Sequence, residues 1–286
     1  MAPSLRAQQL EPRAYSAAPV GTEFLLFSFA RSTGDVLVDP SLPVSNAQAG
    51  INTLVSGYSH TFALFGKTAS VAAVLPYTEA NITALFNDLP AAAQRSGLAD
   101  SQFRFAWNVL GDPAASLAEF VQRPSATTLG VSLTVVAPTG QYDPSRLINI
   151  GSNRWSFRPE MGVSWPLGPW FLEGIAGVTF FTDNNDYYGD VDRSQDPLYA
   201  VQLHGGYTFR PGLWLALDAT HYRGGSTSTN SGPSQATQSN SRYGTTLSLP
   251  LSRAFSMKFA YSNGYAVRAG GDFKTGAITL QYRWFD

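Results

Sequence analysis

The charged residues of this 286-residue chain are few, and the spacing of three of them indicates a candidate site. Lys+Arg number 19 and Asp+Glu 20, which is 14% of the chain, against about 25% in a typical globular protein. Arg154, Arg158 and Glu160 stand at i, i+4 and i+6, so on a β-strand their side chains share one face. Two guanidinium groups beside one carboxylate can accept a carboxylate, phenolate or other anionic group. We expect this cluster, with Glu173 on the next strand, to form an anion-accepting constriction.

The elements that position these residues are β-strands, because apolar and polar side chains alternate with period two along most of the chain. In residues 278–284, for example, Ile278, Leu280, Tyr282 and Trp284 alternate with polar residues. Twelve such segments lie near residues 22–31, 48–62, 67–78, 99–109, 127–137, 154–166, 170–181, 197–210, 212–223, 241–251, 254–264 and 274–285. Their connections alternate between short turns and long polar loops. This pattern is typical of an outer-membrane barrel, with short periplasmic turns and long external loops.

Aromatic residues favour a membrane barrel over a soluble β-sandwich or a soluble barrel. Phe 18, Tyr 13 and Trp 6 are about as numerous as the charges. The apolar faces carry aromatics near both ends, as at Trp155 and Trp165 on one strand and at Tyr282 and Trp284 on the last. Aromatic girdles of this kind mark the two membrane interfaces. We therefore predict an all-β fold, a transmembrane antiparallel β-barrel of about 12 strands with short periplasmic turns and long extracellular loops.

Three segments depart from the regular pattern. The connection 110–126 is long although it belongs to the short-turn side, and Ser116–Val121 within it predicts a short periplasmic helix. Residues 1–21 have no strand period, so we expect a periplasmic segment or a plug there and the barrel in residues 22–286. Trp284 is the last outward aromatic, and we expect it to replace the usual terminal Phe that the barrel-assembly machinery recognises on the C-terminal strand.

The polar faces of the predicted strands enclose the lumen if the apolar faces meet lipid. Charged residues on that side are the candidates for lining the pore or its constriction: Arg104, Arg154, Arg158, Glu160, Glu173, His204, Asp218, Arg242, Lys258 and Arg283. Twelve strands enclose a narrow lumen, in which a few charges can set selectivity. An alternative role for the same residues is a salt-bridge network that holds the barrel wall together. Replacing Arg154 and Arg158 with Ala should change anion preference in a bilayer recording if they form the constriction.

Composition excludes several other classes of function. A net charge of -1 and a pI near 6.3 do not fit a nucleic-acid binder. The absence of Cys excludes disulfides and thiolate chemistry, and three His residues leave little for a metal site, so we expect no cofactor. Loop 183–192 places Asp183, Asp186, Asp190 and Asp192 close in sequence. Oxygen-rich loops can bind calcium, but the spacing of an EF-hand is missing, and a solvated external loop is favoured.

An enzymatic alternative is an outer-membrane phospholipase, a twelve-stranded barrel with a Ser-His dyad on its outer wall. His221 belongs to the outward set, but no His-x-Ser pattern occurs and no Ser is placed beside it by spacing. We therefore expect no enzyme, and interpret His221 as an interfacial residue.

Several runs resemble the outer-membrane "MetA-pathway of phenol degradation" family of proposed transporters. The matching runs are Leu10–Ser16, Pro19–Thr22, Tyr142–Pro144, Leu147–Trp155, Pro159–Glu160, Gln195–Tyr199, Gln202–His204 and Gly224–Gly225. The resemblance implies an outer-membrane barrel that passes small organic molecules.

The sequence and this resemblance together lead to one functional expectation. No ATP-binding motif occurs, and Met1–Arg13 has no apolar signal-peptide core, so an exported protein would be represented here by its mature chain. We expect a channel in the outer membrane of a Gram-negative bacterium, for passive diffusion of small hydrophobic or aromatic molecules. Its partners would be outer-membrane lipids and a small-molecule substrate. The alternative is a structural or adhesive barrel with an occluded lumen.

Overall fold

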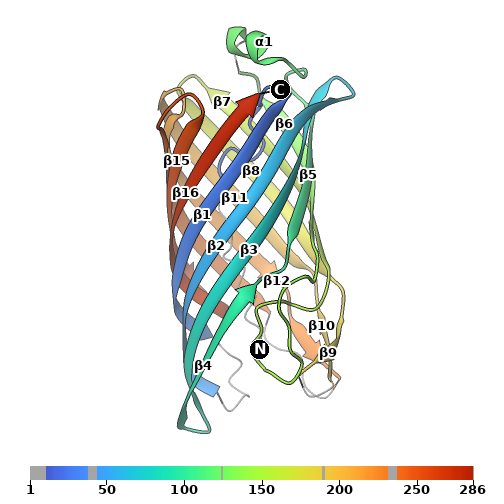
Figure 1. Ribbon diagram of the computed structural model, residues 1–286, viewed down its shortest axis with the longest axis vertical. Coiled ribbons are helices and arrows are strands. Elements are labelled where there is room, and N and C mark those ends of the chain that lie inside the picture. The colour runs from blue at the N-terminus through green and yellow to red at the C-terminus, as the bar shows by residue number, and fades with distance from the viewer. Residues whose placement is uncertain (1–10, 38–43, 124, 189–190, 231–236, 286) are drawn as a thin grey trace.

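The computed structural model describes residues 11–37, 44–123, 125–188, 191–230 and 237–285, and most of them form one closed antiparallel barrel (Figure 1). The strands of the wall are β1 (Thr22–Leu37), β2 (Val44–Leu64), β3 (Lys67–Phe86), β4 (Leu89–Leu98), β5 (Gln102–Leu110), β6 (Thr128–Val136), β7 (Ser156–Leu167), β8 (Trp170–Phe181), β11 (Leu198–Arg210), β12 (Leu213–Gly224), β14 (Gln238–Pro250), β15 (Phe255–Ala266) and β16 (Gly270–Phe285). Strands β4 and β5 both pair with β3 and occupy one position in the wall, so the barrel has twelve strands. Pairing of β1 with β16 closes it. The predicted fold and strand number are confirmed.

One end of the barrel carries short turns, the C-terminus and the only helix of the described residues, α1 (Leu117–Gln122) (Figure 1). The helix begins after Ser116, whose side chain accepts a hydrogen bond from the Glu119 backbone N–H, while the Glu119 carboxylate accepts one from the Ser116 N–H at 2.9 Å. This reciprocal capping box satisfies two donors that a helix start otherwise leaves open. The predicted helix is therefore present, at the predicted end. No helix of the described residues is long and apolar enough to cross a membrane.

Two of the loops expected from sequence contain strands. The region 79–98 is a hairpin continuing β3 into β4, and its turn residues Asn87 and Asp88 have φ of 49° and 62°, a left-handed conformation that Asn and Asp tolerate. In addition, β9 (Asn184–Tyr187), β10 (Val191–Gln195) and β13 (Thr227–Thr229) form a small separate sheet. Strands beyond the membrane need no apolar face, so their sequences lack the alternation that identified the others.

In the barrel wall the apolar side chains face outward and the polar ones inward, the reverse of a soluble protein. On β12 the outward residues Leu215 and Leu217 are exposed, whereas Asp218 and Thr220 on the inward face are buried. Trp155, just before β7, and Trp165, near the end of β7, are 45% and 50% exposed. They stand ten residues apart, roughly 33 Å along the strand, or about 25 Å of height at the usual tilt, which matches the apolar band of an outer-membrane barrel.

Candidate functional site: the barrel lumen

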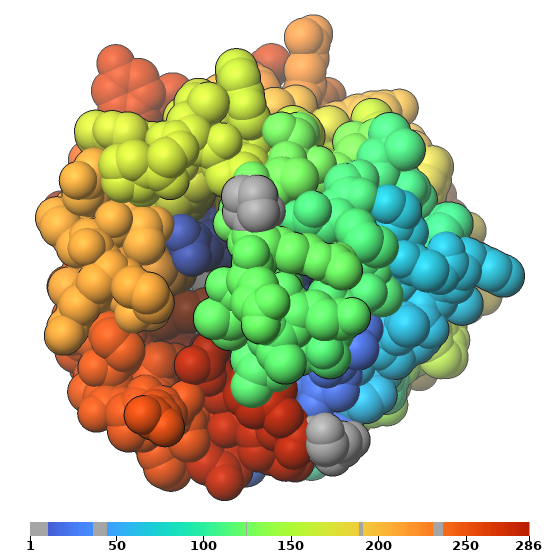
Figure 2. All heavy atoms as spheres, turned by 90° about the horizontal axis from the view of Figure 1, so that it is seen from above, coloured from blue at the N-terminus to red at the C-terminus, as the bar shows by residue number. Residues whose placement is uncertain are grey.

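Two stretches of chain fold into the barrel interior. The first is residues 11–21, here called the lumen segment, which precedes β1. The second is residues 137–155 between β6 and β7, here called the inner loop. Figure 2 looks onto the α1 end and shows a hollow beside the green α1 connection, with blue residues from the beginning of the described chain inside it.

Tyr15 anchors the lumen segment in a recess made by two glycines. Its side chain is 2% exposed, and a Cβ atom at Gly130 or Gly162 would collide with its ring. These glycines face each other as a cross-strand pair on β6 and β7, so the wall is flat where the ring lies. The Tyr15 hydroxyl hydrogen bonds with Ser132 Oγ at 2.8 Å. The recess therefore fits a planar ring with a polar tip.

Arg13 lies over two neighbouring aromatic rings of the wall. Its guanidinium carbon is 4.4 Å from the Phe171 ring centroid and 5.2 Å from the Trp214 centroid, and both rings are only 4% exposed. Its Nη2 donates to Thr208 Oγ1 at 2.6 Å. Cations over aromatic faces are attracted by the ring quadrupole, more strongly where water is excluded.

Glu173 on β8 holds the turn that follows Arg13. Its carboxylate accepts hydrogen bonds from the Arg13 backbone N–H, from Ser16 Oγ at 3.0 Å and from Ser164 Oγ at 2.8 Å. The side chain is buried at 5% exposure. Because a buried carboxylate needs several donors, Glu173 and the lumen segment stabilise each other.

The inner loop is fastened to the wall through Asp100, in the break between β4 and β5. One carboxylate oxygen accepts from the Gly140 N–H at 3.0 Å, and the other from the Ser152 N–H at 3.0 Å and from Ser152 Oγ. The two arms of the loop then touch directly, because a Cβ at Gly151 would lie 2.7 Å from the Gly140 carbonyl carbon. Both contacts bring the base of the loop together.

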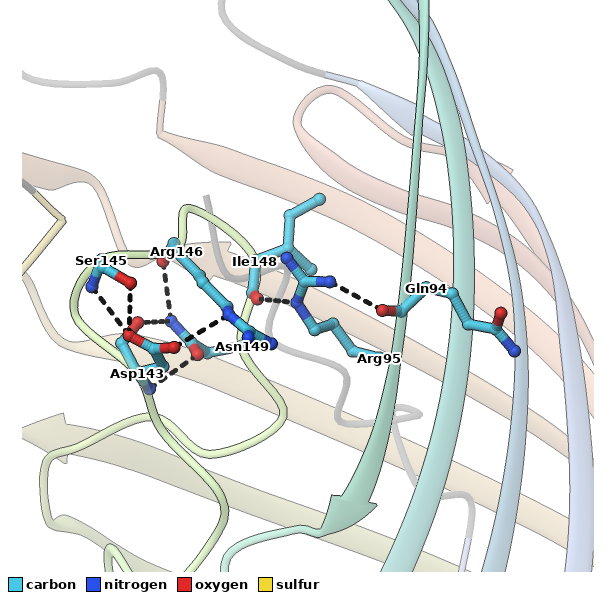
Figure 3. Close-up of polar contacts among 7 residues, drawn as sticks. All are labelled: Gln94, Arg95, Asp143, Ser145, Arg146, Ile148 and Asn149. Carbon is cyan, nitrogen blue, oxygen red and sulfur yellow. Dashed lines mark hydrogen bonds and ion pairs between the residues drawn. The ribbon is translucent and has the colours of Figure 1, made fainter.

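Polar contacts, drawn in Figure 3, fix the rest of the inner loop together with apolar packing. Asn149 Nδ2 donates to the carbonyls of Asp143 and Arg146 at 3.0 and 2.8 Å, while its Oδ1 accepts from the Asp143 N–H. Arg95 Nε on β4 donates to the Ile148 carbonyl at 3.1 Å. Ile150 packs into an apolar cluster on the inner wall with Ala49, Ile51, Ala80 and Ile82.

Two predicted residues form a buried pair on adjacent strands of the wall. His204 Nδ1 on β11 lies 2.7 Å from Asp218 Oδ1 on β12, and both side chains have no exposed surface. Asp218 also accepts from Thr246 Oγ1 at 2.9 Å. Glu173 is the neighbour of His204 on the other side, so three of the predicted residues form a continuous row across β8, β11 and β12.

Further predicted residues reach the interior from other strands. Arg104 Nη2 lies 3.3 Å from Ser132 Oγ, and its guanidinium lies over the Tyr15 ring at 5.2 Å. Arg242 donates to Ser262 Oγ and to the Phe273 carbonyl at 3.1 and 2.8 Å. Lys258 Nζ is 5.8 Å from the Trp214 ring centroid. These contacts link predicted residues both to the wall and to the lumen segment.

The structure does not bring the expected four-residue cluster together. Arg158 Nε and Glu160 Oε1 are 3.4 Å apart, but Arg154 precedes β7 and donates to Gln195. Glu173 pairs in register with Ser164, ten residues from Arg154 and so roughly 33 Å along the strand. Residues on the same face of neighbouring strands can still lie far apart along the strand direction. Sequence spacing does not show this separation, so the predicted cluster was wrong. Arg283 is exposed and donates to the Arg253 carbonyl at 3.0 Å.

Several buried polar atoms on the inward faces have no hydrogen-bond partner within the described protein. They are Arg104 Nε, Thr134 Oγ1, Gln202 Oε1, His204 Nε2, Thr220 Oγ1 and Arg242 Nε. Buried polar groups are nearly always paired with protein or water. Their gathering on one surface indicates an interior that accommodates water or polar solutes.

Two other regions singled out from sequence look different in the structure. His221 Nδ1 lies 2.9 Å from Ser241 Oγ on the outer face, so a serine does lie beside it, contrary to the sequence interpretation. The contact crosses from β12 to β14, and spacing along one strand does not reveal it. No group of three His, Cys, Asp or Glu suited to a metal occurs in the described residues; Asp190 of the acidic loop lies outside them.

Sequence reasoning missed Arg13, Tyr15 and their aromatic and glycine partners as functional residues. The available signal was the family resemblance, since both residues stand in the run Leu10–Ser16. The partners come from β6, β7, β8 and β12, and no local pattern assembles them.

Comparisons with known proteins agree with this architecture. The chain is similar to the COG4313 outer membrane channel of Pseudomonas putida F1, with 22% identity, 96% of this chain and 100% of that chain covered, and a TM-score of 0.83. It is also similar to the β-domain of the Bordetella autotransporter BrkA (13% identity; 93% and 100% covered; TM-score 0.54). A third similar structure is the transport unit of AIDA-I from Escherichia coli (10% identity; 98% and 94% covered; TM-score 0.55). A comparison with curated protein sequences finds no match.

The barrel fold and these similar structures point to the outer membrane of a Gram-negative bacterium. A family profile matches residues 29–285, nearly the whole chain. The chain therefore belongs to the family described as "Putative MetA-pathway of phenol degradation".

Proposed function

We propose that the protein is a passive outer-membrane channel for small hydrophobic or aromatic molecules. The observation that carries the proposal is the interior of the barrel. Its inward faces carry buried polar atoms without a hydrogen-bond partner among the described residues, and the lumen segment fills part of the space through contacts made mostly by the Arg13 and Tyr15 side chains. An interior of this kind suits solutes that pass beside or in place of that segment.

Aromatic side chains on the inner wall support the substrate class. Phe171 and Trp214 form an edge-to-face pair with centroids 5.9 Å apart, and Tyr222 is a third inward aromatic, 8% exposed. Aromatic rings attract other aromatic rings in such geometries. The family's association with phenol degradation agrees with a substrate that combines a ring and a polar group.

Charged residues of the inner wall would set the selectivity of this channel. We place this role on Arg104, Arg158, Glu160 and Arg242, whose side chains all reach the interior. Arg154 and Arg283 lie toward the two ends and would act at the mouths. A few fixed charges suffice for selectivity in a narrow pore.

Proteoliposome swelling tests the channel proposal. Benzenesulfonate is permanently charged, so lipid alone excludes it, and arabinose serves as a non-aromatic solute of similar size. We expect entry of benzenesulfonate to be faster in vesicles that hold the protein than in empty vesicles, and faster than entry of arabinose. A protein that admits no solute would favour the structural or adhesive barrel instead.

The His221–Ser241 contact favours a second candidate, a lipid-acting esterase on the outer wall. A hydroxyl within hydrogen-bond reach of an imidazole is the minimum for nucleophilic catalysis. Purified protein in mixed phospholipid micelles would then release fatty acid, and Ser241→Ala would abolish the release. An equal release by the variant would exclude this candidate.

The C-terminal strand carries a further expected contact. Trp284 stacks on Tyr282 with centroids 5.3 Å apart and lies 6.5 Å from Tyr58 on the outer face. We propose that this aromatic patch is the signal through which β16 meets the barrel-assembly machinery, and that it then faces membrane lipid.

A further inference from the structure

The place occupied by Arg13 has the chemistry of a binding site for an organic cation. The guanidinium lies over two adjacent buried aromatic rings, Phe171 and Trp214, and Thr208 accepts a hydrogen bond from it. The buried carboxylate of Glu173 lies at the Arg13 backbone. Aromatic faces with a nearby carboxylate and hydroxyl are the usual means by which proteins bind guanidinium and ammonium groups.

Arg13 itself fits this place imperfectly. Its φ of 70° is in the left-handed region, which is unfavourable for residues other than glycine. Its Nε is buried and has no hydrogen-bond partner among the described residues, which costs part of the desolvation energy of a charged group. A free ligand carries no backbone strain and can orient its donors independently.

A second cation weakens the hold on Arg13 further. Lys258 Nζ lies 5.8 Å from the centroid of the Trp214 ring that Arg13 also contacts. Two like charges at one ring repel each other. A ligand that replaces Arg13 charge for charge leaves this balance unchanged while removing the strain.

We propose that Phe171, Trp214, Thr208 and Glu173 form a lumen site for a small aromatic cation bearing an ammonium or guanidinium group, and that Arg13 occupies it as an internal competitor. Binding of the ligand releases the lumen segment from the wall. The inference deepens the proposed channel function, on which it rests, by naming the ligand class and the part of the chain that the ligand displaces.

Hydrogen exchange measured by mass spectrometry on the full-length protein in detergent tests the displacement. The probe is phenylethylammonium chloride, with phenylethanol as its neutral isostere and phenylacetate as its anionic counterpart. We expect exchange in peptides from residues 11–21 to accelerate with the ammonium at about millimolar concentration, since tethered Arg13 competes at an effective concentration of that order. Phenylethanol and phenylacetate should leave it unchanged. An equal response to all three probes, or no response to the ammonium, would overturn the proposal.

Variants separate the site from unspecific effects. Trp214→Leu and, should it fail to fold, Thr208→Val should weaken the response to the ammonium. Arg13→Ala removes the competitor, so calorimetry should show the ammonium binding about tenfold more tightly than to the unaltered chain, the scale of one desolvated cation–π contact. Arg253→Ala, which changes an exposed arginine in the turn between β14 and β15, is the matched control and should behave like the unaltered chain. Unchanged affinity in Arg13→Ala would contradict the competition.

Conductance measured in parallel distinguishes the two proposals. Exchange that responds to the ammonium in a protein that never conducts would leave the cation site standing and refute the channel. Conductance without any response of residues 11–21 would support the channel and refute the cation site.

Discussion

The two stretches of chain inside the barrel are held by different kinds of interaction. The inner loop is joined at its base by Asp100, closed by direct backbone contact between Gly140 and Gly151, and buried through Ile150 in an apolar cluster. The lumen segment ends in backbone hydrogen bonds from Val20 and Gly21 to the Ala115 and Thr61 carbonyls. Before that point it is held mainly by side chains, Arg13 and Tyr15 above all.

The difference indicates which stretch can move. Backbone contacts and apolar packing cannot be exchanged for a solute without unfolding part of the loop. Side-chain contacts to a ring, a hydroxyl and a carboxylate can be reproduced by a small molecule. The inner loop is therefore part of the wall in energetic terms, whereas the lumen segment behaves as a replaceable occupant.

The largest expected effect comes from Asp100→Ala. Removing the carboxylate leaves the Gly140 and Ser152 N–H groups without an acceptor, and unsatisfied buried donors together cost about 3 kcal/mol of unfolding free energy. The measurement is the temperature at which the folded band disappears in heat-modifiability gels. Asp143→Ala removes a carboxylate of the same loop that lies near solvent and serves as the control. Equal melting of both variants would show that the inner loop is not fixed at its base.

Gly162→Ala should come next, and should affect the lumen segment alone. The added Cβ collides with the Tyr15 ring, and losing the burial of that ring costs about 2 kcal/mol. Hydrogen exchange in residues 11–21 should accelerate while exchange in the inner loop stays constant. At Gly174 a Cβ would meet only ordinary contacts, 3.7 Å from Leu203, so Gly174→Ala is the matched control. If exchange in the lumen segment stays slow in the Gly162→Ala variant, the Tyr15 ring does not hold the segment in place, and the interpretation of the segment as a replaceable occupant is wrong.

Tyr15→Phe is expected to have a smaller effect. The ring remains in its glycine recess, but the hydrogen bond to Ser132 Oγ is lost, which costs about 1 kcal/mol. Exchange in residues 11–21 should rise modestly, less than in Gly162→Ala. A larger effect than that of Gly162→Ala would mean that the hydroxyl, rather than the ring, anchors the segment.

The smallest expected effect is a pH dependence of the inner loop. Hydrogen bonds from the Ser145 side chain and backbone, with a lesser contribution from Arg146, hold the pKa of Asp143 below its usual value. A depressed pKa means that the stabilisation is present above the usual aspartate pKa, roughly 4, and is lost as the pH falls through the lower value of the folded state. Local exchange in residues 143–149 should therefore rise only under strongly acidic conditions. Asp143→Asn should remove this dependence, and its persistence in the variant would assign it to another group.

The fold could be predicted because the membrane imposes a simple pattern on sequence. On β12, lipid on one side and a polar interior on the other require Leu215 and Leu217 to alternate with Asp218 and Thr220, and this alternation is visible in the chain. The extension of β3 into β4 lies beyond that constraint and could not be predicted in the same way. The same reasoning explains why β9, β10 and β13 were not anticipated.

The site was harder to predict from the sequence, because its side chains come from different strands that only the strand register brings together. The period-two alternation assigned Glu173, His204 and Asp218 to the inward face, but only the strand register shows that they are neighbours. The same alternation grouped Arg154 with Glu173, although the two residues lie far apart along the strand direction. The partners of Arg13 and Tyr15 come from six strands, so the role of the lumen segment becomes visible only in three dimensions.

The central claim is that the lumen segment closes the barrel lumen and can be displaced from it. The most direct test is single-channel conductance after deletion of residues 2–18. The deletion leaves Pro19, whose carbonyl accepts hydrogen bonds from Thr22 and Thr61 at the start of the barrel. In planar bilayers the shortened protein should conduct several-fold more current than the full chain, with the same melting behaviour in gels. Equal conductance of the two folded proteins would contradict the account.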